Sequence, residues 1–184
     1  MIPINPYSRT GKKLKEVRAI VIHWPFWSCA SAQTIHDYFA NIAGEKRYAS
    51  SQYVVGLQGE ILSVMPEDEL AYHCGSSSVD PKSKKVYTDL ARELFGEYAS
   101  IKNSPNYVTI GIEVCHIDVN GTMTDTTINA LRNLCIRLCN TYSLDPITKL
   151  LRHYDIVGCK SCPKYWCDNP EEWEAFKQSV KEGI

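Results

Sequence analysis

The 184-residue sequence has little excess charge and lacks a long apolar run. Its Lys and Arg number 20 and its Asp and Glu 21, so the formal net charge is -1. Nucleic-acid-binding domains carry a basic patch, and this balance argues against that class. Because a helix needs about 20 apolar residues to cross a bilayer, we expect no membrane insertion. Internal repeats, low-complexity segments and convincing linkers are also missing, which fits one domain over residues 1–184.

The first residues lack the apolar core of a signal peptide. In MIPINPYSRTGKKLKEV the basic residues follow the few apolar ones, the reverse of a secretory signal. We therefore expect synthesis in the cytoplasm and exit by another route. Prolines and a glycine interrupt residues 1–16, which we expect to form an arm before the first strand.

Cysteine, in contrast, is abundant, with eight residues. The missing signal favours reduced thiols over a secreted disulfide framework. Cys135 and Cys139 lie one helical turn apart on an apolar face, and Cys115 lies in an apolar run, so these three are expected to be buried. Cys29 and Cys74 fall near predicted loops, and the sequence leaves a disulfide between them open.

The hydrophobic pattern predicts alternating strands and helices. Strands are expected at residues 18–24, 51–65 (a hairpin), 107–116 and 146–151. Helices are expected at 31–43, 88–95, 125–142 and 171–180, with Ser31 and Thr124 as caps. The rest of 76–107 is expected to be a surface excursion. The runs at 18–24 and 107–116 are apolar on both faces, which indicates central strands.

Residues 152–166, RHYDIVGCKSCPKYW, hold the densest group of chemically active side chains. A neutral imidazole from His153 and a thiolate from Cys162 suit zinc, and Lys160 lies two residues before the cysteine. A catalytic zinc site uses three protein ligands and one open position. The best third candidate is His23, because it ends the apolar run 18–24.

Two other interpretations compete for this stretch. Cys159 and Cys162 form a C-x-x-C, the spacing of a structural zinc knuckle or a redox pair. A knuckle usually needs a second ligand pair, which Cys167 with His153 supplies only irregularly. A redox pair is expected at a strand-to-helix turn and has no use for a preceding histidine.

Glu113 stands inside the apolar strand text YVTIGIEVCH. A carboxylate there is costly unless it is paired or functional. One interpretation is an edge strand with Glu113 facing water. The other is a general base whose pKa is raised by burial.

The text H-Y-D-I-V-G-C-K-S-C-P resembles the C-terminal motif of the zinc-dependent N-acetylmuramoyl-L-alanine amidases of the amidase-2 type, a superfamily that includes phage endolysins, bacterial autolysins and peptidoglycan recognition proteins. The text G-I-E-V-C resembles the strand that carries their catalytic glutamate. Cys159 is an insertion relative to the motif, which makes it a rival of Cys162; the Lys-x-Cys-Pro pairing favours Cys162. The resemblance covers roughly residues 17–166.

This resemblance implies a single α/β domain with a mixed central sheet, helices on both faces and zinc at one edge of the sheet. The expected reaction is hydrolysis of the amide between the lactyl group of N-acetylmuramic acid and L-alanine. His23, His153 and Cys162 would hold one Zn²⁺ per chain. Glu113 would be the general base, and Lys160 would stabilise the oxyanion. The expected partner is peptidoglycan, in the role of a phage or prophage endolysin or an autolysin that reaches the wall after host lysis or by a holin-type route.

The resemblance also assigns residues to the substrate groove. The block PEDELAYHCG is similar to the family text that borders the groove, so His73 and Tyr72 are expected to face substrate. Trp24, Trp27 and Trp166 are further candidates for its wall, or else core residues. Some members place a tyrosine near the metal where this chain has Ser51, so the glutamate and lysine must carry the chemistry. The alternatives are a peptidoglycan-binding protein without activity and a structural-zinc interaction module.

Overall fold

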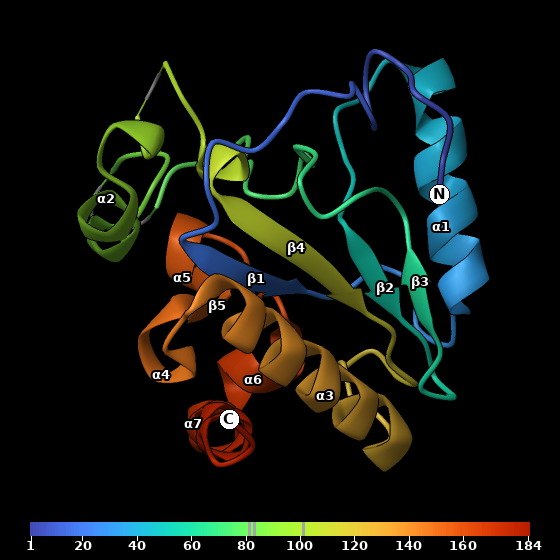
Figure 1. The fold of residues 1–184 in the computed structure, drawn as a ribbon, viewed down its shortest axis with the longest axis vertical. Helices are drawn as coiled ribbons and strands as arrows, with labels where there is room; N and C mark the ends of the chain where they lie inside the picture. The colour runs from blue at the N-terminus through green and yellow to red at the C-terminus, as the bar shows by residue number, and fades with distance from the viewer. Residues whose placement is uncertain (81, 83, 101) are drawn as a thin grey trace.

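The structure is a computed structural model that describes residues 1–80, 82, 84–100 and 102–184 (Figure 1). The described strands form one five-stranded sheet in the order β3-β2-β4-β1-β5. Neighbouring strands are parallel except for β2 and β3, which form the predicted antiparallel hairpin. The strands are β1 (Ala19–His23), β2 (Tyr53–Val55), β3 (Ile61–Ser63), β4 (Thr109–Val114) and β5 (Leu150–Arg152).

Helices cover both faces of this sheet, which confirms the predicted α/β class. They are α1 (Ala32–Asn41), α2 (Asp89–Phe95), α3 (Asp125–Tyr142), α4 (Pro146–Lys149), α5 (His153–Val157), α6 (Lys164–Asp168) and α7 (Pro170–Lys181). Short 3-10 turns span Ile42–Glu45, Gly96–Tyr98 and Pro105–Tyr107. In the excursion 76–107, residues 81, 83 and 101 lie outside the described part.

Side-chain caps explain where the predicted helices begin. Ser31, Thr88 and Thr124 each accept a hydrogen bond from the backbone N–H three residues later, as Ser and Thr caps do. The sequence therefore places these three starts correctly.

One face of the sheet carries the larger core. Ile20 and Ile22 of β1 and Ile110 and Ile112 of β4 pack against α3 and α7 on this face. Because side chains alternate along a strand, the residues that follow Ile22 and Ile112 point to the opposite face. The two central strands therefore present His23 and Glu113 away from α3.

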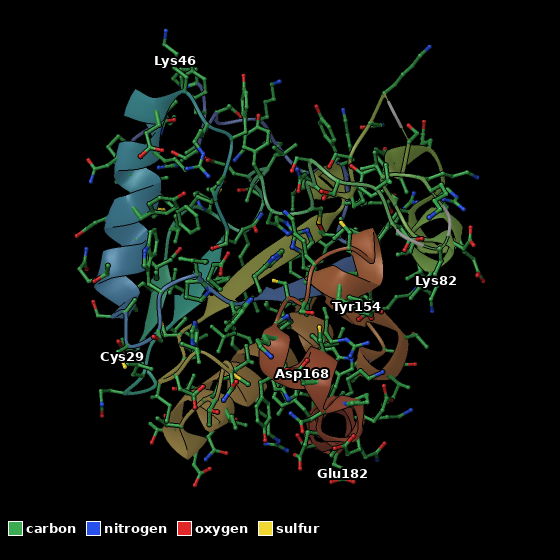
Figure 2. The ribbon with its side chains drawn as sticks, turned by 180° about the vertical axis from the view of Figure 1, so that it is seen from behind. Cys29, Lys46, Lys82, Tyr154, Asp168 and Glu182 are labelled. Atoms are coloured by element: carbon green, nitrogen blue, oxygen red, sulfur yellow. The ribbon has the colours of Figure 1, made fainter. Side chains whose placement is uncertain are left out.

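That opposite face is only partly covered by helices. The helix α1 packs over β2 and β3, and α2 with α5 packs beside β1. Figure 2 shows this side, with α1 at the left and α2 at the right of the sheet. Between α1 on one side and α2 with α5 on the other, no described helix covers the carboxyl ends of β1 and β4 on this face.

The strand predicted at residues 146–151 is wrong in its first part. Asp145 caps a single helical turn, α4, by accepting from Ile147 N–H, and Pro146 occupies the first position of that turn. Proline suits that position because it has no N–H to donate. The strand β5 begins only at Leu150.

Other regions add detail to the predictions. The N-terminal arm is pinned to the domain, since Ile2 is buried and Arg9 pairs with Glu69 at 2.7 Å. All eight cysteines are free thiols, including Cys29 and Cys74. None of the helices in the described part of the chain is both long and apolar enough to cross a membrane.

Candidate functional site

The carboxyl ends of β1 and β4 place a histidine beside a glutamate. His23 is the last residue of β1 and is in register with Glu113 of β4. Both central strands are paired on either side, so the edge-strand interpretation of Glu113 is wrong. The sheet itself therefore sets the relative positions of these two side chains.

The junction of β5 and α5 adds the second histidine. Arg152 of β5 is in register with Ile22, so His153 follows it at the position next to His23. The two imidazole rings lie 4.7 Å apart between centroids. Asp155 fixes this turn by accepting from Arg152 N–H at 2.8 Å and by pairing with the Arg152 guanidinium at 2.7 Å.

The loop after α5 brings in a cysteine. Cys162 Sγ lies 3.8 Å from His23 Nδ1, and Tyr154 N–H donates to the Cys162 carbonyl at 2.9 Å, which holds the loop against α5. One ligand atom each from His23, His153 and Cys162 lies within 4.8 Å of the others. Within the described residues this is the only such group of three or more His, Cys, Asp or Glu side chains.

The rival cysteine points elsewhere. Cys159 Sγ lies 3.1 Å from Ser76 Oγ and contacts the Ser78 carbonyl. It therefore anchors the excursion 76–107, and the geometry favours Cys162 as the metal ligand. A structural site built on Cys159, Cys162 and Cys167 has no counterpart among the described residues.

The site disfavours charge on its own side chains. Burial lowers the pKa of His23 well below its usual value, and the electrostatic influence of the neighbouring His153 and His73 adds to this effect. Burial, followed by the charge of Lys160, lowers the pKa of His153 to about 3. Both histidines are thus neutral at pH 7, the form in which an imidazole binds a metal.

The pKa values of the two acidic groups, the Glu113 carboxyl and the Cys162 thiol, are raised instead. Burial raises the pKa of Glu113 to about 8. Burial also raises the pKa of the Cys162 thiol far above its usual value, and the nearby Glu113 adds to this rise. A cation held among these ligands would oppose both shifts, because it stabilises a thiolate and a carboxylate.

Two buried atoms of the site lack a hydrogen-bond partner. Among the described residues, the buried side-chain polar atoms without one are Thr10 Oγ1, Glu113 Oε2 and His153 Nε2. Buried polar atoms are normally paired, so a free imidazole nitrogen beside a second imidazole and a thiol is the arrangement of a metal site. Two nitrogens and one sulfur are a ligand set that suits zinc, and a catalytic zinc site keeps its fourth position open.

These groups lie at the base of a cleft of about 770 Å³. Lys160 stands on its wall, exposed, with Nζ donating to the Gly75 carbonyl at 3.1 Å. Aromatic side chains line the cleft, with Trp24 beside His23 and Tyr72 in contact with Tyr48 at 5.1 Å between ring centroids. The structure therefore brings together His23, Glu113, His153, Lys160 and Cys162 in one place.

Other predicted groove residues are distributed differently. Ser51 is fully buried and donates its hydroxyl to the Tyr53 carbonyl at 2.9 Å, so the structure does not bring it to the cleft. Trp166 packs on Trp173 in the main core, 5.0 Å between centroids, and does not line the groove. Trp27 lies at a smaller neighbouring pocket with Tyr38.

His73 lies at the base of the cleft and is buried. Its Nδ1 is 3.0 Å from His23 Nε2. Burial lowers its pKa to about 4. Its expected contact with substrate stays a prediction.

Sequence reasoning missed part of the cleft wall. Arg47, Tyr48 and Ser50 line it from the segment between α1 and β2. They lie in irregular backbone, where no periodic pattern marks which side chains face inward. The only local signal was the proximity of this segment to the predicted hairpin.

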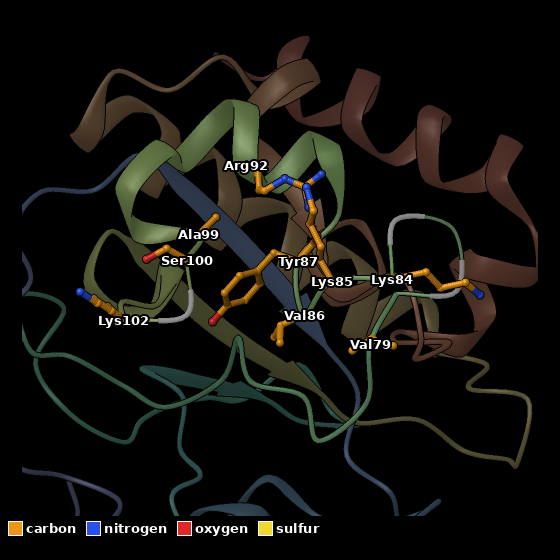
Figure 3. A pocket seen from close by; sticks show the side chains of 9 residues that line it. All are labelled: Val79, Lys84, Lys85, Val86, Tyr87, Arg92, Ala99, Ser100 and Lys102. Atoms are coloured by element: carbon orange, nitrogen blue, oxygen red, sulfur yellow. The ribbon is translucent and has the colours of Figure 1, made fainter.

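A second cavity, of about 640 Å³, lies away from these groups, beside α2 (Figure 3). Its described lining contains no His, Cys, Asp or Glu, so it offers no ligands of the kind found at the base of the cleft. The lining residues are Val79, Lys84, Lys85, Val86, Tyr87, Arg92, Ala99, Ser100 and Lys102.

Sequence comparison connects this geometry with known proteins. The sequence model of the family described as N-acetylmuramoyl-L-alanine amidase matches residues 13–165. N-acetylmuramoyl-L-alanine amidase BlyA of Bacillus subtilis (strain 168) is 32% identical over 180 residues, which cover 98% of this chain. The match covers 45% of that relative, so the chain spans less than half of its length.

Solved structures share the fold at lower identity. The catalytic domain of XlyA superposes with a TM-score of 0.67 at 20% identity, over 98% of this chain and 95% of that one. A mutant endolysin from Bacillus subtilis gives a TM-score of 0.66 at 20% identity, with the same coverage. At this identity the likeness speaks for the fold alone.

Proposed function

The chain belongs to the N-acetylmuramoyl-L-alanine amidase family, and from this premise we propose that it is a zinc-dependent amidase of peptidoglycan. The bond cleaved is the amide between the lactyl group of N-acetylmuramic acid and L-alanine. The catalytic domain extends over residues 1–184, with residues 1–16 as an arm. The matched relative BlyA bears the name of this activity.

One observation carries the proposal. Ligand atoms of His23, His153 and Cys162 converge within 4.8 Å at the base of a cleft, and the buried Nε2 of His153 has no partner among the described protein atoms. These three side chains would hold one Zn²⁺ per chain. When bound, the metal supplies a Lewis acid that polarises the amide carbonyl and lowers the pKa of nearby water.

Glu113 is suited to move the proton. Its Oε2 is buried and unpartnered beside the ligands, so it can accept a proton from an attacking water and pass it to the leaving nitrogen of L-alanine. A general base within hydrogen-bond reach typically contributes ~10²- to 10⁴-fold in rate.

Lys160 is suited to stabilise negative charge. Its ammonium group stands on the cleft wall, is held by the Gly75 carbonyl, and lies near enough to His153 for its charge to lower the pKa of that imidazole. As the amide carbon becomes tetrahedral, its oxygen gains charge that a nearby cation stabilises.

The aromatic wall is suited to hold a glycan and a peptide. Trp24 and Tyr72 offer flat apolar faces in the cleft, and Tyr48 and Phe26 extend them toward solvent. Sugar rings and peptide side chains bind such surfaces by apolar contact, while Arg47 adds a charge for a carboxylate. Peptidoglycan is therefore the proposed partner, in the role of a phage or prophage endolysin or an autolysin acting at the cell wall.

Cell-wall digestion tests this function. Purified peptidoglycan is incubated with the protein, and newly exposed amino groups of L-alanine are identified by end-group labelling. We expect release that stops when a chelator is added and returns with zinc. Binding to the walls without release would instead indicate a non-catalytic peptidoglycan-binding protein.

A further inference from the structure

A chain of short polar contacts runs from the ligand His23 into the interior of the protein. His23 Nε2 lies 3.0 Å from His73 Nδ1. His73 Nε2 lies 3.2 Å from Thr109 Oγ1, which in turn lies 2.8 Å from the Pro105 carbonyl. The three side chains are buried, and Thr109 is the first residue of β4.

The last contact determines where the protons lie. The Thr109 hydroxyl has one proton, and a carbonyl oxygen can only accept. Two oxygens 2.8 Å apart attract each other only with a proton between them, so Thr109 donates to Pro105. The Thr109 oxygen must then accept from His73, which places a proton on His73 Nε2.

The same reasoning determines which ring nitrogen of His23 carries the proton. A neutral imidazole with a proton on Nε2 has an acceptor at Nδ1, so His73 Nδ1 accepts from His23 Nε2. His23 therefore carries its single proton on Nε2 and leaves the lone pair on Nδ1. That nitrogen is the one that faces Cys162 Sγ, at 3.8 Å.

We propose that His73 is a positioning residue that, through the chain His23–His73–Thr109–Pro105, holds His23 in the tautomer whose Nδ1 is free to bind metal. The inference rests on the proposed zinc site and assigns His73 to the support of a ligand.

The surroundings of His73 hold its ring in place. Asn106 Oδ1 accepts from the backbone N–H groups of His73, at 3.0 Å, and of Cys74, at 2.7 Å. Beneath the ring lies Gly111 of β4, where an added Cβ would come within 2.7 Å of His73 Cγ. The glycine thus leaves the space that the imidazole fills between β4 and His23.

The thiol of Cys74 also approaches His73 Nδ1, the nitrogen that accepts from His23. Cys74 Sγ lies 3.3 Å from His73 Nδ1 and 3.5 Å from Thr109 Oγ1. A thiol is a weak donor, and the contact from His23 is the shorter one. Cys74 therefore leaves the direction of the chain unchanged.

Substitutions at Thr109 test the chain at a position remote from the metal. Thr109→Ser keeps the hydroxyl, whereas Thr109→Val keeps the shape and removes the acceptor of His73 Nε2. Histidine ¹⁵N spectra of the metal-free proteins report the tautomers directly. We expect His23 with its proton on Nε2 in the wild type and in Thr109→Ser, and a mixture of tautomers in Thr109→Val.

Substitutions at His73 test the link to the ligand. The Asn side chain places a carbonyl oxygen where Nδ1 of the histidine was, and Leu places a methyl group there. Zinc affinity is measured by competition with a chromophoric chelator. We expect His73→Leu to lose roughly 10- to 100-fold in affinity, the usual effect of removing the partner of a ligating histidine. His73→Asn should recover most of it, and Thr109→Val should show a smaller loss.

These measurements separate the inference from the proposed function. If the wild type binds no zinc, the proposed function fails, while the tautomer of His23 in the metal-free protein still tests the chain. If the wild type binds zinc but His23 carries its proton on Nδ1, the inference is overturned. Equal zinc affinity of the Asn and Leu variants, both folded by circular dichroism, would also overturn it.

Discussion

Two polar clusters of the molecule differ in how their atoms are paired. In the first, which we call the metal-site cluster (His23, Glu113, His153 and Cys162), a carboxylate oxygen and an imidazole nitrogen are buried without partners. The second, which we call the tyrosine network, comprises Tyr53, Glu67, Arg137 and Tyr142, and joins β2 to α3. Here the Glu67 carboxylate accepts from Tyr142 at 2.9 Å and from Tyr53, and pairs with Arg137 at 2.6 Å.

The electrostatics of the clusters differ in the same way. Burial would raise the pKa of Glu67, but hydrogen bonds from Arg137, Tyr53 and Tyr142 outweigh it and lower that pKa. In the metal-site cluster, burial acts on Glu113 without such compensation, and its pKa rises to about 8. Paired polar groups stabilise the fold, whereas unpaired ones need a ligand or substrate to complete them.

Replacing the glutamate by glutamine should lower turnover in the metal-site cluster but not in the tyrosine network. Glu113→Gln removes the proton acceptor, so we expect turnover on cell walls to fall by about 10²- to 10⁴-fold with zinc retained. Glu67→Gln should leave turnover near the wild-type value. Rates of amide release, with zinc content determined on the same samples, check both. Near-normal turnover of Glu113→Gln would remove Glu113 from the mechanism.

The next largest loss of turnover is expected from replacing Lys160, the lysine on the cleft wall. Lys160→Ala should lower turnover by about 10²- to 10³-fold, since one donor to the oxyanion is lost. Because Lys160 is not a ligand, zinc binding should be retained. Lys164→Ala is the control, since Lys164 pairs with Asp168 on α6. Equal rates of the two variants would show that Lys160 does not stabilise the oxyanion.

Of Cys159 and Cys162, only Cys162 should be needed for the stability that zinc adds to the folded state. At a free zinc concentration 100 times the Kd, binding stabilises the folded state by about 2.7 kcal/mol. Cys162→Ser should lose most of this gain, whereas Cys159→Ser should keep it. Thermal unfolding with zinc and with chelator measures the difference. The reverse pattern would show that Cys159 is the ligand.

The smallest effect concerns the tyrosine network. Glu67→Gln should lower the free energy of unfolding by about 1 kcal/mol, because hydrogen bonds to a charged, partly exposed group are weakened. A carboxyl whose pKa is lowered on folding contributes stability above its usual value of 4.5, and this is lost as pH falls. Urea unfolding at pH 6 and at pH 3 should therefore show the two proteins converging at acid pH. A constant difference would contradict the network.

The sequence predicted several residues of the site from their positions in apolar runs. His23 was selected because it ends the run 18–24, and Glu113 because it is a carboxylate inside the run 107–116. In the structure β1 and β4 are adjacent parallel strands, which brings these two side chains together. Cys162 was chosen over Cys159 by its pairing with Lys160 in the motif, and the geometry favours the same choice. The apolar runs are local signals that one sequence suffices to show, whereas the choice of Cys162 rested on the resemblance to the family motif.

Long-range packing decides what the sequence left open. Trp166 was a candidate for either the groove wall or the core, and contacts with α7 place it in the core. Ser51 was matched to a family position near the metal; here it is buried, and its hydroxyl donates to the Tyr53 carbonyl at the start of β2. The contact between His73 and His23 joins residues 50 positions apart, and no pattern in the sequence encodes it.

X-ray absorption at the zinc edge tests the central claim most directly. With one Zn²⁺ per chain, we expect one sulfur ligand at about 2.3 Å and two histidine nitrogens at about 2.0–2.1 Å. In Cys162→Ser the sulfur signal should disappear, and in Cys159→Ser it should persist. A zinc site with two or more sulfur ligands, or with sulfur retained in Cys162→Ser, would contradict the metal site built from His23, His153 and Cys162.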